Sequence, residues 1–515
     1  MLIFLKVKYK IKTSFNCHLF LSMRKISIFL PILFSNFLFA SFDMNERMKK
    51  SYLHIMNLEF AQAQHIINKE KEFKNNGITV LHENYIDFLT IIINEEKSYF
   101  LDKEKLKLTR INQLKSYDPN SPFYLFAQAE IHLQWAIARL KFEQYITAGY
   151  EINKAYSLLK KNQELFPEFK LNKKSLAVLK ILIGTIPSDF AWIPKLIGMH
   201  GNVQEGLRDL RDLSSLVKND IQFNIYDIEI IFLSAFLEMS MQNNSSTYID
   251  ILNQIGDRYK TNILLNFTAS RLASKIGKND LAIKILLDQP VLKESIPFYY
   301  MDYVLAMKFL YKLNYKNAKF YFKKFLANYK GLNYIKSTYH KLALISYLEK
   351  EEYKMRQYYD KVIKFGVRVI DEDKKSDKEA KKNSMPNKIL LKVRLLYDGG
   401  YYDLAEEQLN LISDLNSIKA IDLSEYYYRK GQISSLLNQS KINTLKFFRK
   451  SFVNINSSTK HFGPNSLLNI ALIYEDQNQK DSSQVYYKKC LNLSGFDYQR
   501  GIHRKAKAGL NRIGY

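Results

Sequence analysis

The chain has 515 residues, of which 47% are hydrophobic and 25% are charged. This composition excludes wholesale disorder, and the length requires several domains or a repeat array. Only 18 glycines and 10 prolines occur, which argues against a many-stranded β fold and favours long helices joined by short turns.

The formal net charge is +26, and residues 1–40 contribute six of the lysines and arginines and no acid. The other lysines are scattered among Asn, Ile, Tyr and Phe. This mixture is typical of a biased coding sequence without selection for binding. The alternative is a basic face that meets an acidic partner, nucleic acid or anionic lipid.

Residues 23–40 have the three parts of a secretory signal peptide. Met23-Arg24-Lys25 is a positive start, an apolar run follows over 26–39, and Ala40 offers a small residue at the cleavage site. Pro31 interrupts this run, which is also short for a membrane span. We therefore expect residues 1–22 to be an upstream extension, and the mature protein to be exported to the bacterial periplasm or cell surface without a transmembrane helix.

From residue 41 onward, apolar residues follow helical spacing almost throughout. The pattern divides into N-terminal helical repeats (41–181), a Gly-, Pro- and Trp-rich segment (182–210), middle repeats (211–370), a charged segment (371–387) and C-terminal repeats (388–515). Dense glycines permit tight turns, so we expect 182–210 to form a compact hairpin or lid. The charged segment has no apolar face, and we expect a mobile linker loop there.

A pair pattern recurs in which the second helix of each pair carries a small residue that lets two antiparallel helices approach closely. This small residue is Ala148, Ala282, Ala318, Ala405 or Ser483, with Tyr315 and Tyr402 at the accompanying aromatic position. In two further segments it falls on Met355 or Arg356, and on Asn443 or Thr444.

These segments resemble tetratricopeptide repeats, and the chain also looks like a group of secreted repeat proteins from the Bacteroidetes. The resemblance implies an all-α fold, an α-solenoid of antiparallel helix pairs with six to eight repeats. Successive hairpins would then bury their apolar faces against one another.

No constellation for catalysis or metal binding is visible in the sequence. The nine histidines are dispersed, and neither a phosphate-cradling loop nor a nucleophile elbow occurs. We therefore predict no catalytic residue, no metal and no cofactor, and we expect Cys490 to be a buried, inert thiol. An active site within 192–206 is disfavoured, because no nucleophile and base stand together there.

The family resemblance implies that the first helix of each pair lines a concave groove for a protein segment. The expected groove residues are Tyr300, Tyr303, Met307, Tyr311, His340, Tyr347 and Tyr428. Tyrosine suits recognition, although an aromatic row at helical spacing is also typical of the core between repeats. We predict a non-enzymatic scaffold that binds a protein or peptide partner and no nucleic acid, with peripheral association to the envelope. The alternative is a basic surface that binds an anionic polymer or lipid headgroups.

Overall fold

The computed structural model describes residues 41–186, 201–241, 244–291, 294–382, 385–416, 418–455 and 459–515. Throughout these ranges the secondary structure is helical, apart from a single β-bridge between Ser41 and Asn76. The leader and most of the Gly-, Pro- and Trp-rich segment lie outside the described residues. The helices are α1 (Glu46–Met56), α2 (Phe60–Phe73), α3 (Gly77–Asn94), α4 (Lys97–Glu104), α5 (Leu106–Leu114), α6 (Pro122–Lys141), α7 (Tyr145–Leu165), α8 (Leu171–Gly184), α10 (Val203–Lys218), α11 (Asp227–Met241), α12 (Ser245–Ile255), α13 (Ile263–Lys275), α14 (Asn279–Leu287), α15 (Tyr300–Tyr311), α16 (Tyr315–Asn328), α17 (Ile335–Leu348), α18 (Glu352–Lys364), α19 (Asp371–Lys382), α20 (Lys388–Asp398), α21 (Tyr402–Asn410), α22 (Ala420–Leu436), α23 (Lys441–Val453), α24 (Phe462–Asp476), α25 (Lys480–Leu491) and α26 (Gln499–Arg512).

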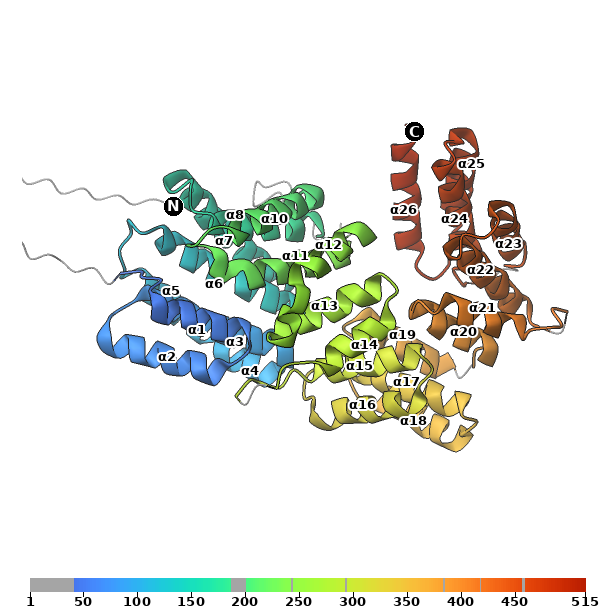
Figure 1. Ribbon diagram of the computed structural model, residues 1–515, viewed down its shortest axis with the longest axis horizontal. Helices are drawn as coiled ribbons and strands as arrows, with labels where there is room; N and C mark the ends of the chain where they lie inside the picture. Colours follow the sequence, from blue (N-terminus) through green and yellow to red (C-terminus); the bar gives the residue numbers. More distant parts are fainter. Residues whose placement is uncertain are drawn as a thin grey trace, which may run out of the picture. The chain divides into compact units, whose positions relative to one another are not determined.

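Most helices follow one another as antiparallel hairpins (Figure 1), and one turn geometry recurs between the two helices of such a pair. Each first helix is followed by one residue in the left-handed conformation, and the next N–H donates to the carbonyl five residues back, as Asn314 does to Phe309 at 2.9 Å. This bond pattern closes a helix end efficiently. Within the described ranges the left-handed residues of this kind are Leu58, Glu143, Gly277, Leu313, Lys350, Gly400, Asn438 and Asn478. They mark the pairs α1–α2, α6–α7, α13–α14, α15–α16, α17–α18, α20–α21, α22–α23 and α24–α25, which confirms an all-α solenoid of helical hairpins.

The small position of each second helix is buried, as the close packing of two helices requires. Ala148, Ala282, Ala318, Ala405 and Ser483 are all fully buried. The structure also settles the two open assignments, because Met355 is 8% exposed and Thr444 is 2% exposed while Arg356 and Asn443 are exposed. Met355 fits because it packs with Ala343 of the preceding helix, whose side chain is small.

The expectation of a linker loop over 371–387 is wrong for 371–382, which form helix α19. Acidic residues occupy its first turn and lysines its last turn, so its charges complement the helix dipole. Its buried face is polar, because Asp373 and Asp377 face α17 and accept hydrogen bonds or ion pairs from it. The helix is an insertion, since the turn residues Lys350 and Gly400 are 50 residues apart whereas Gly277 and Leu313 are 36 apart.

The repeats on either side of α15–α18 touch each other. A Cβ on Gly400 would lie 2.1 Å from the carbonyl oxygen of Gly277, so the two turns approach with no room for a side chain. The Tyr401 hydroxyl accepts a hydrogen bond from the Asn279 side chain at 3.0 Å and donates one to Asp280 at 2.8 Å. The turns that follow α13 and α20 therefore pack against each other, although α15–α18 separate the two hairpins in the sequence.

The ends of the 182–210 segment are helical, since residues 182–184 complete α8 and residues 203–210 begin α10. Three of its glycines lie where these two helices cross. A Cβ on Gly201 would lie 2.1 Å from the backbone nitrogen of Gly184, and one on Gly206 would lie 2.7 Å from the Ala177 carbonyl oxygen. The predicted hairpin or lid, together with Trp192, falls on residues 187–200, which are outside the described ranges.

A buried ionic network fastens four helices of the N-terminal part. The Lys174 ammonium of α8 lies 3.1 Å from Glu130 of α6 and 2.9 Å from Glu229 of α11, and it also contacts the Tyr85 hydroxyl of α3 at 3.1 Å. Burial disfavours the charge on Lys174, but the two carboxylates outweigh it and raise its pKa. Buried charges of this kind persist only when they are paired, so the network serves packing.

Among the described helices, none is both long and apolar enough to cross a membrane.

Candidate partner-binding face

The seven expected groove residues divide into a buried set and a partly exposed set. Tyr303, His340 and Tyr428 are at most 5% exposed. Tyr300, Met307, Tyr311 and Tyr347 are half-buried and reach the surface of the first helices. Their role in binding remains a prediction, but only the second set offers surface to a partner.

Tyr303 lies in an aromatic cluster that joins α15 to its neighbours. Its hydroxyl hydrogen bonds to the Ser337 Oγ at 2.9 Å, and its ring lies 4.8 Å from that of Tyr334 and 5.7 Å from that of Tyr300. Tyr300 in turn lies 6.0 Å from Phe267 of α13. Tyr303 thus holds the repeats together, whereas Tyr300 presents the edge of this cluster.

The other buried members are also held by internal contacts. His340 lies 3.2 Å from Glu379 of α19, and burial lowers its pKa to about 3, so its ring is neutral at physiological pH. Tyr428 accepts a hydrogen bond from Asn465 at 2.5 Å. Tyr347, although half-buried, donates to the Pro386 carbonyl at 3.0 Å and faces the connection between α19 and α20.

Four cations on the same first-helix faces were not among the expected residues. Arg271 and Lys275 lie one turn apart on α13, Lys308 lies on α15 and Lys341 lies on α17. No carboxylate lies within ion-pair distance of any of the four in the described part of the chain. Their spacing on successive first helices was a signal available in the sequence, but it was hidden among 77 lysines and arginines.

Lys308 is the most enclosed of these four, with 5% of its surface exposed. Its Nζ lies 5.3 Å from the centre of the Tyr311 ring. Burial, and then the charges of Arg271 and Lys275, lower the pKa of Lys308 to about 7, while Asp398 opposes this shift. An uncompensated cation in such a position is costly unless an anion reaches it.

Farther along the same face, cations and carboxylates balance one another. Arg394 of α20 pairs with Glu425 of α22, and Arg429 lies 3.7 Å from the same carboxylate. Lys375 of α19 lies 4.0 Å from Glu379. The exposed Asp398 interacts with cations of α17, α19, α20 and α22, so the charges of these four helices act on one another across this face.

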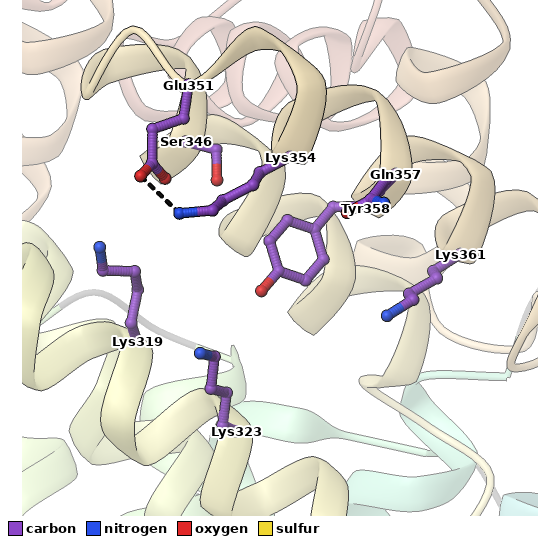
Figure 2. Close-up of a pocket in the computed structure, with 8 residues that line it drawn as sticks. All are labelled: Lys319, Lys323, Ser346, Glu351, Lys354, Gln357, Tyr358 and Lys361. Carbon is purple, nitrogen blue, oxygen red and sulfur yellow. Dashed lines mark hydrogen bonds and ion pairs between the residues drawn. The ribbon is translucent and has the colours of Figure 1, made fainter.

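A second basic surface lies on the opposite helices of the repeats, α16 and α18. A cavity of about 250 Å³ lies there. Figure 2 shows its lining residues, among them Lys319, Lys323, Lys354 and Lys361, with Glu351 and Tyr358 beside them. Glu351 accepts from Lys354 at 2.6 Å, and Lys319 pairs with Glu349 at 2.7 Å. Two of the four lysines therefore have carboxylate partners, which weakens the attraction of this pocket for an anion.

The described residues contain no group of three His, Cys, Asp or Glu side chains placed to hold a metal ion. Cys490 is fully buried, as expected. Its Sγ lies 3.4 Å from the Pro464 carbonyl, and burial raises its pKa to about 11. A protonated thiol in this position is a poor nucleophile.

Comparison with known proteins adds a family and a set of structures. The model of the family Iml2/Tetratricopeptide repeat protein 39 matches residues 90–387, which is more than half of the chain. A search of curated proteins gives no match. Among solved structures, a human IFIT1 dimer with PPP-AAAA is 13% identical, with a TM-score of 0.24, and the match covers 92% of this chain and 95% of that one. A monomeric IFIT1 mutant with Gppp-AAAA is 14% identical, with a TM-score of 0.26, and covers 84% and 99%. Likeness at this level says nothing about what this chain binds.

Proposed function

Since the chain belongs to the Iml2/Tetratricopeptide repeat protein 39 family, we propose that it is a non-enzymatic interaction scaffold whose first helices bind a segment of a protein partner. The segment would lie across α13, α15, α17, α20 and α22. Repeats of this type stack into continuous surfaces that suit extended or helical peptides.

The observation that carries this proposal is the chemistry of the first-helix face. Tyr300, Met307 and Tyr311 supply half-buried aromatic and thioether surface, and Arg271 and Lys308 supply charge beside it. Recognition surfaces combine such anchors with a few charged groups. The second helices, by contrast, expose single apolar residues such as Phe320, Tyr353 and Ile442, a scatter that is normal for a protein surface.

Photo-crosslinking in cells tests the proposal. A benzophenone amino acid at Met307 should form a discrete crosslinked product, while the same group at Phe320 on the outer helix α16 should not. The crosslinked protein is then identified by mass spectrometry. Equal products from both positions, or a product from Phe320 alone, would refute the groove assignment.

The alternative function, binding of an anionic polymer or of lipid headgroups, is supported by the lysine pocket of Figure 2. The carboxylates beside Lys319 and Lys354 make it the weaker candidate. Binding of anionic vesicles that is lost in Lys323→Gln/Lys361→Gln would favour this alternative.

We also propose that residues 23–40 direct export and that the mature protein works in the periplasm or at the cell surface. The motif of a positive start, an apolar run and Ala40 supports this. Cell fractionation together with the mass of the mature N terminus tests it, and a cytoplasmic, uncleaved chain would contradict it.

A further inference from the structure

Charged side chains are distributed unevenly along the first-helix face. On α13 and α15, Arg271, Lys275 and Lys308 have no carboxylate within ion-pair distance in the part of the chain that the structure describes. The face of α19, α20 and α22 contributes Glu379, Asp398 and Glu425 among its cations. The α13–α15 end of this face thus attracts anions, and the end formed by α19, α20 and α22 carries compensated charge.

The cationic end also has a defined apolar border. Phe267 and Arg271 are one helical turn apart on α13, and Tyr300 lies against Phe267 with 6.0 Å between ring centres. On α15, Lys308 and the Tyr311 ring stand next to each other. Carboxylates of a ligand could therefore reach the cations while its neighbouring apolar groups cover the aromatic rings.

Lys308 is the most enclosed cation at this end of the face. It is more than nine-tenths buried and has no carboxylate within ion-pair distance in the described ranges; Arg271 and Lys275 repel its charge, and the more distant Asp398 opposes this only in part. Buried charges in folded proteins are normally paired. A carboxylate placed between Arg271 and Lys308 would supply that pair and form charge-assisted hydrogen bonds.

The carboxylates on α19, α20 and α22 favour one class of anionic ligand over another. A continuous polyanion such as a nucleic acid would carry negative charge along its whole length and meet Glu379, Asp398 and Glu425. A peptide with a short acidic run would place its charge at α13 and α15 only. Electrostatic complementarity of this kind sets specificity more than affinity.

We propose that the α13–α15 end of the first-helix face is a subsite for an acidic peptide segment, whose carboxylates contact Arg271, Lys275 and Lys308. This inference rests on the proposed function and adds the chemical class of the bound segment.

Fluorescence anisotropy with a labelled short polyglutamate peptide and the full chain tests the subsite. Loss of a charge-assisted contact at a partly enclosed site weakens binding by about tenfold. We expect that loss in Arg271→Gln/Lys308→Met, and a smaller loss in Lys275→Gln, whose site is exposed. The matched control, Lys323→Gln/Lys361→Gln, removes the same charge from the outer pocket and should leave the affinity unchanged.

Three outcomes would overturn the subsite. These are no binding of polyglutamate to the wild-type chain, equal loss in the outer-pocket control, or tighter binding of an oligothymidylate that the same inner variants abolish. Lys275→Gln keeps the test informative should the double variant fold poorly, and circular dichroism checks each variant. A crosslink from Met307 without polyglutamate binding would refute this inference alone, whereas absence of the crosslink would refute the proposed function.

Discussion

At the scale of single residues, the aromatic groove residues separate by burial in a way that helical spacing cannot resolve. Tyr300 and Tyr303 both lie on the predicted face, but Tyr303 turns into the cluster with Tyr334 and Ser337. A side chain on a first helix can contact either the adjacent repeat or the solvent. Its surroundings decide this, and they come from segments distant in the sequence.

Lys308 gives a pH-dependent prediction. Its pKa is about 7 in the folded chain against an ordinary value of 10.5, because of burial and then of Arg271 and Lys275, opposed by Asp398 of α20. Between these pH values the unfolded chain binds a proton that the folded chain lacks. The destabilisation of the fold by Lys308 is therefore full below about pH 7, decreases steadily between the folded pKa of about 7 and the ordinary value of 10.5, and is absent at higher pH.

Replacing Lys308 by Met should thus stabilise the fold by roughly 2–3 kcal/mol more at about pH 6.5 than at about pH 9.5. Urea unfolding at both pH values measures the difference. The exposed Lys316 of α16 provides the control, and Lys316→Met should show no such dependence. A gain that is independent of pH would indicate that Lys308 is paired in solution.

At the scale of elements, the repeats were predictable because each turn and each small position recurs. The spacing around Ala318 and Ala405 was sufficient to identify helix pairs, although Met355 and Thr444 depart from the small-residue rule. Helix α19 was not predictable, because an apolar stripe is the usual sign of a packed helix and its buried face instead carries Asp373 and Asp377. Its packing depends on backbone groups of another repeat.

The side chain of Asp373, on α19, caps the start of helix α17. Helix α17 begins after Tyr334, which has a φ of 68° and provides no side-chain cap of its own. The fully buried Asp373 carboxylate accepts from the backbone N–H of Tyr334 at 2.7 Å and of Ser337 at 2.8 Å. It therefore satisfies N–H groups that a helix start leaves without partners.

Asp373→Ala should destabilise the chain by about 1–2 kcal/mol, the usual cost of losing a helix cap. Denaturant unfolding followed by circular dichroism measures it. Asp371→Ala removes an exposed acid from the same first turn and should cost much less. Similar losses of unfolding free energy in the two variants would contradict the capping role of Asp373 and indicate a general effect of acidic residues on the α19 dipole.

At the scale of the whole molecule, the family and the repeat fold agree with each other, while the partner, the export of the chain and its likeness to secreted Bacteroidetes proteins remain predictions. From the sequence we predicted that the first helices carry a binding face, and this stays a prediction. It could not predict the uncompensated cations, because charge balance depends on which carboxylates reach each lysine in the folded chain. Lys312, directly after α15, has Asp280 at 2.8 Å, whereas Lys308, one turn earlier, has no such partner in the described ranges.

Competitive acylation of lysines, quantified by mass spectrometry with and without the polyglutamate peptide, tests the central claim that the first helices form the binding face. A bound segment covers the amines it contacts, so Lys275, Lys308 and Lys341 should react more slowly in its presence. Lys323, Lys354 and Lys361 of the outer pocket should react at unchanged rates. Protection of the outer lysines with no change at Lys275 and Lys308 would contradict the account.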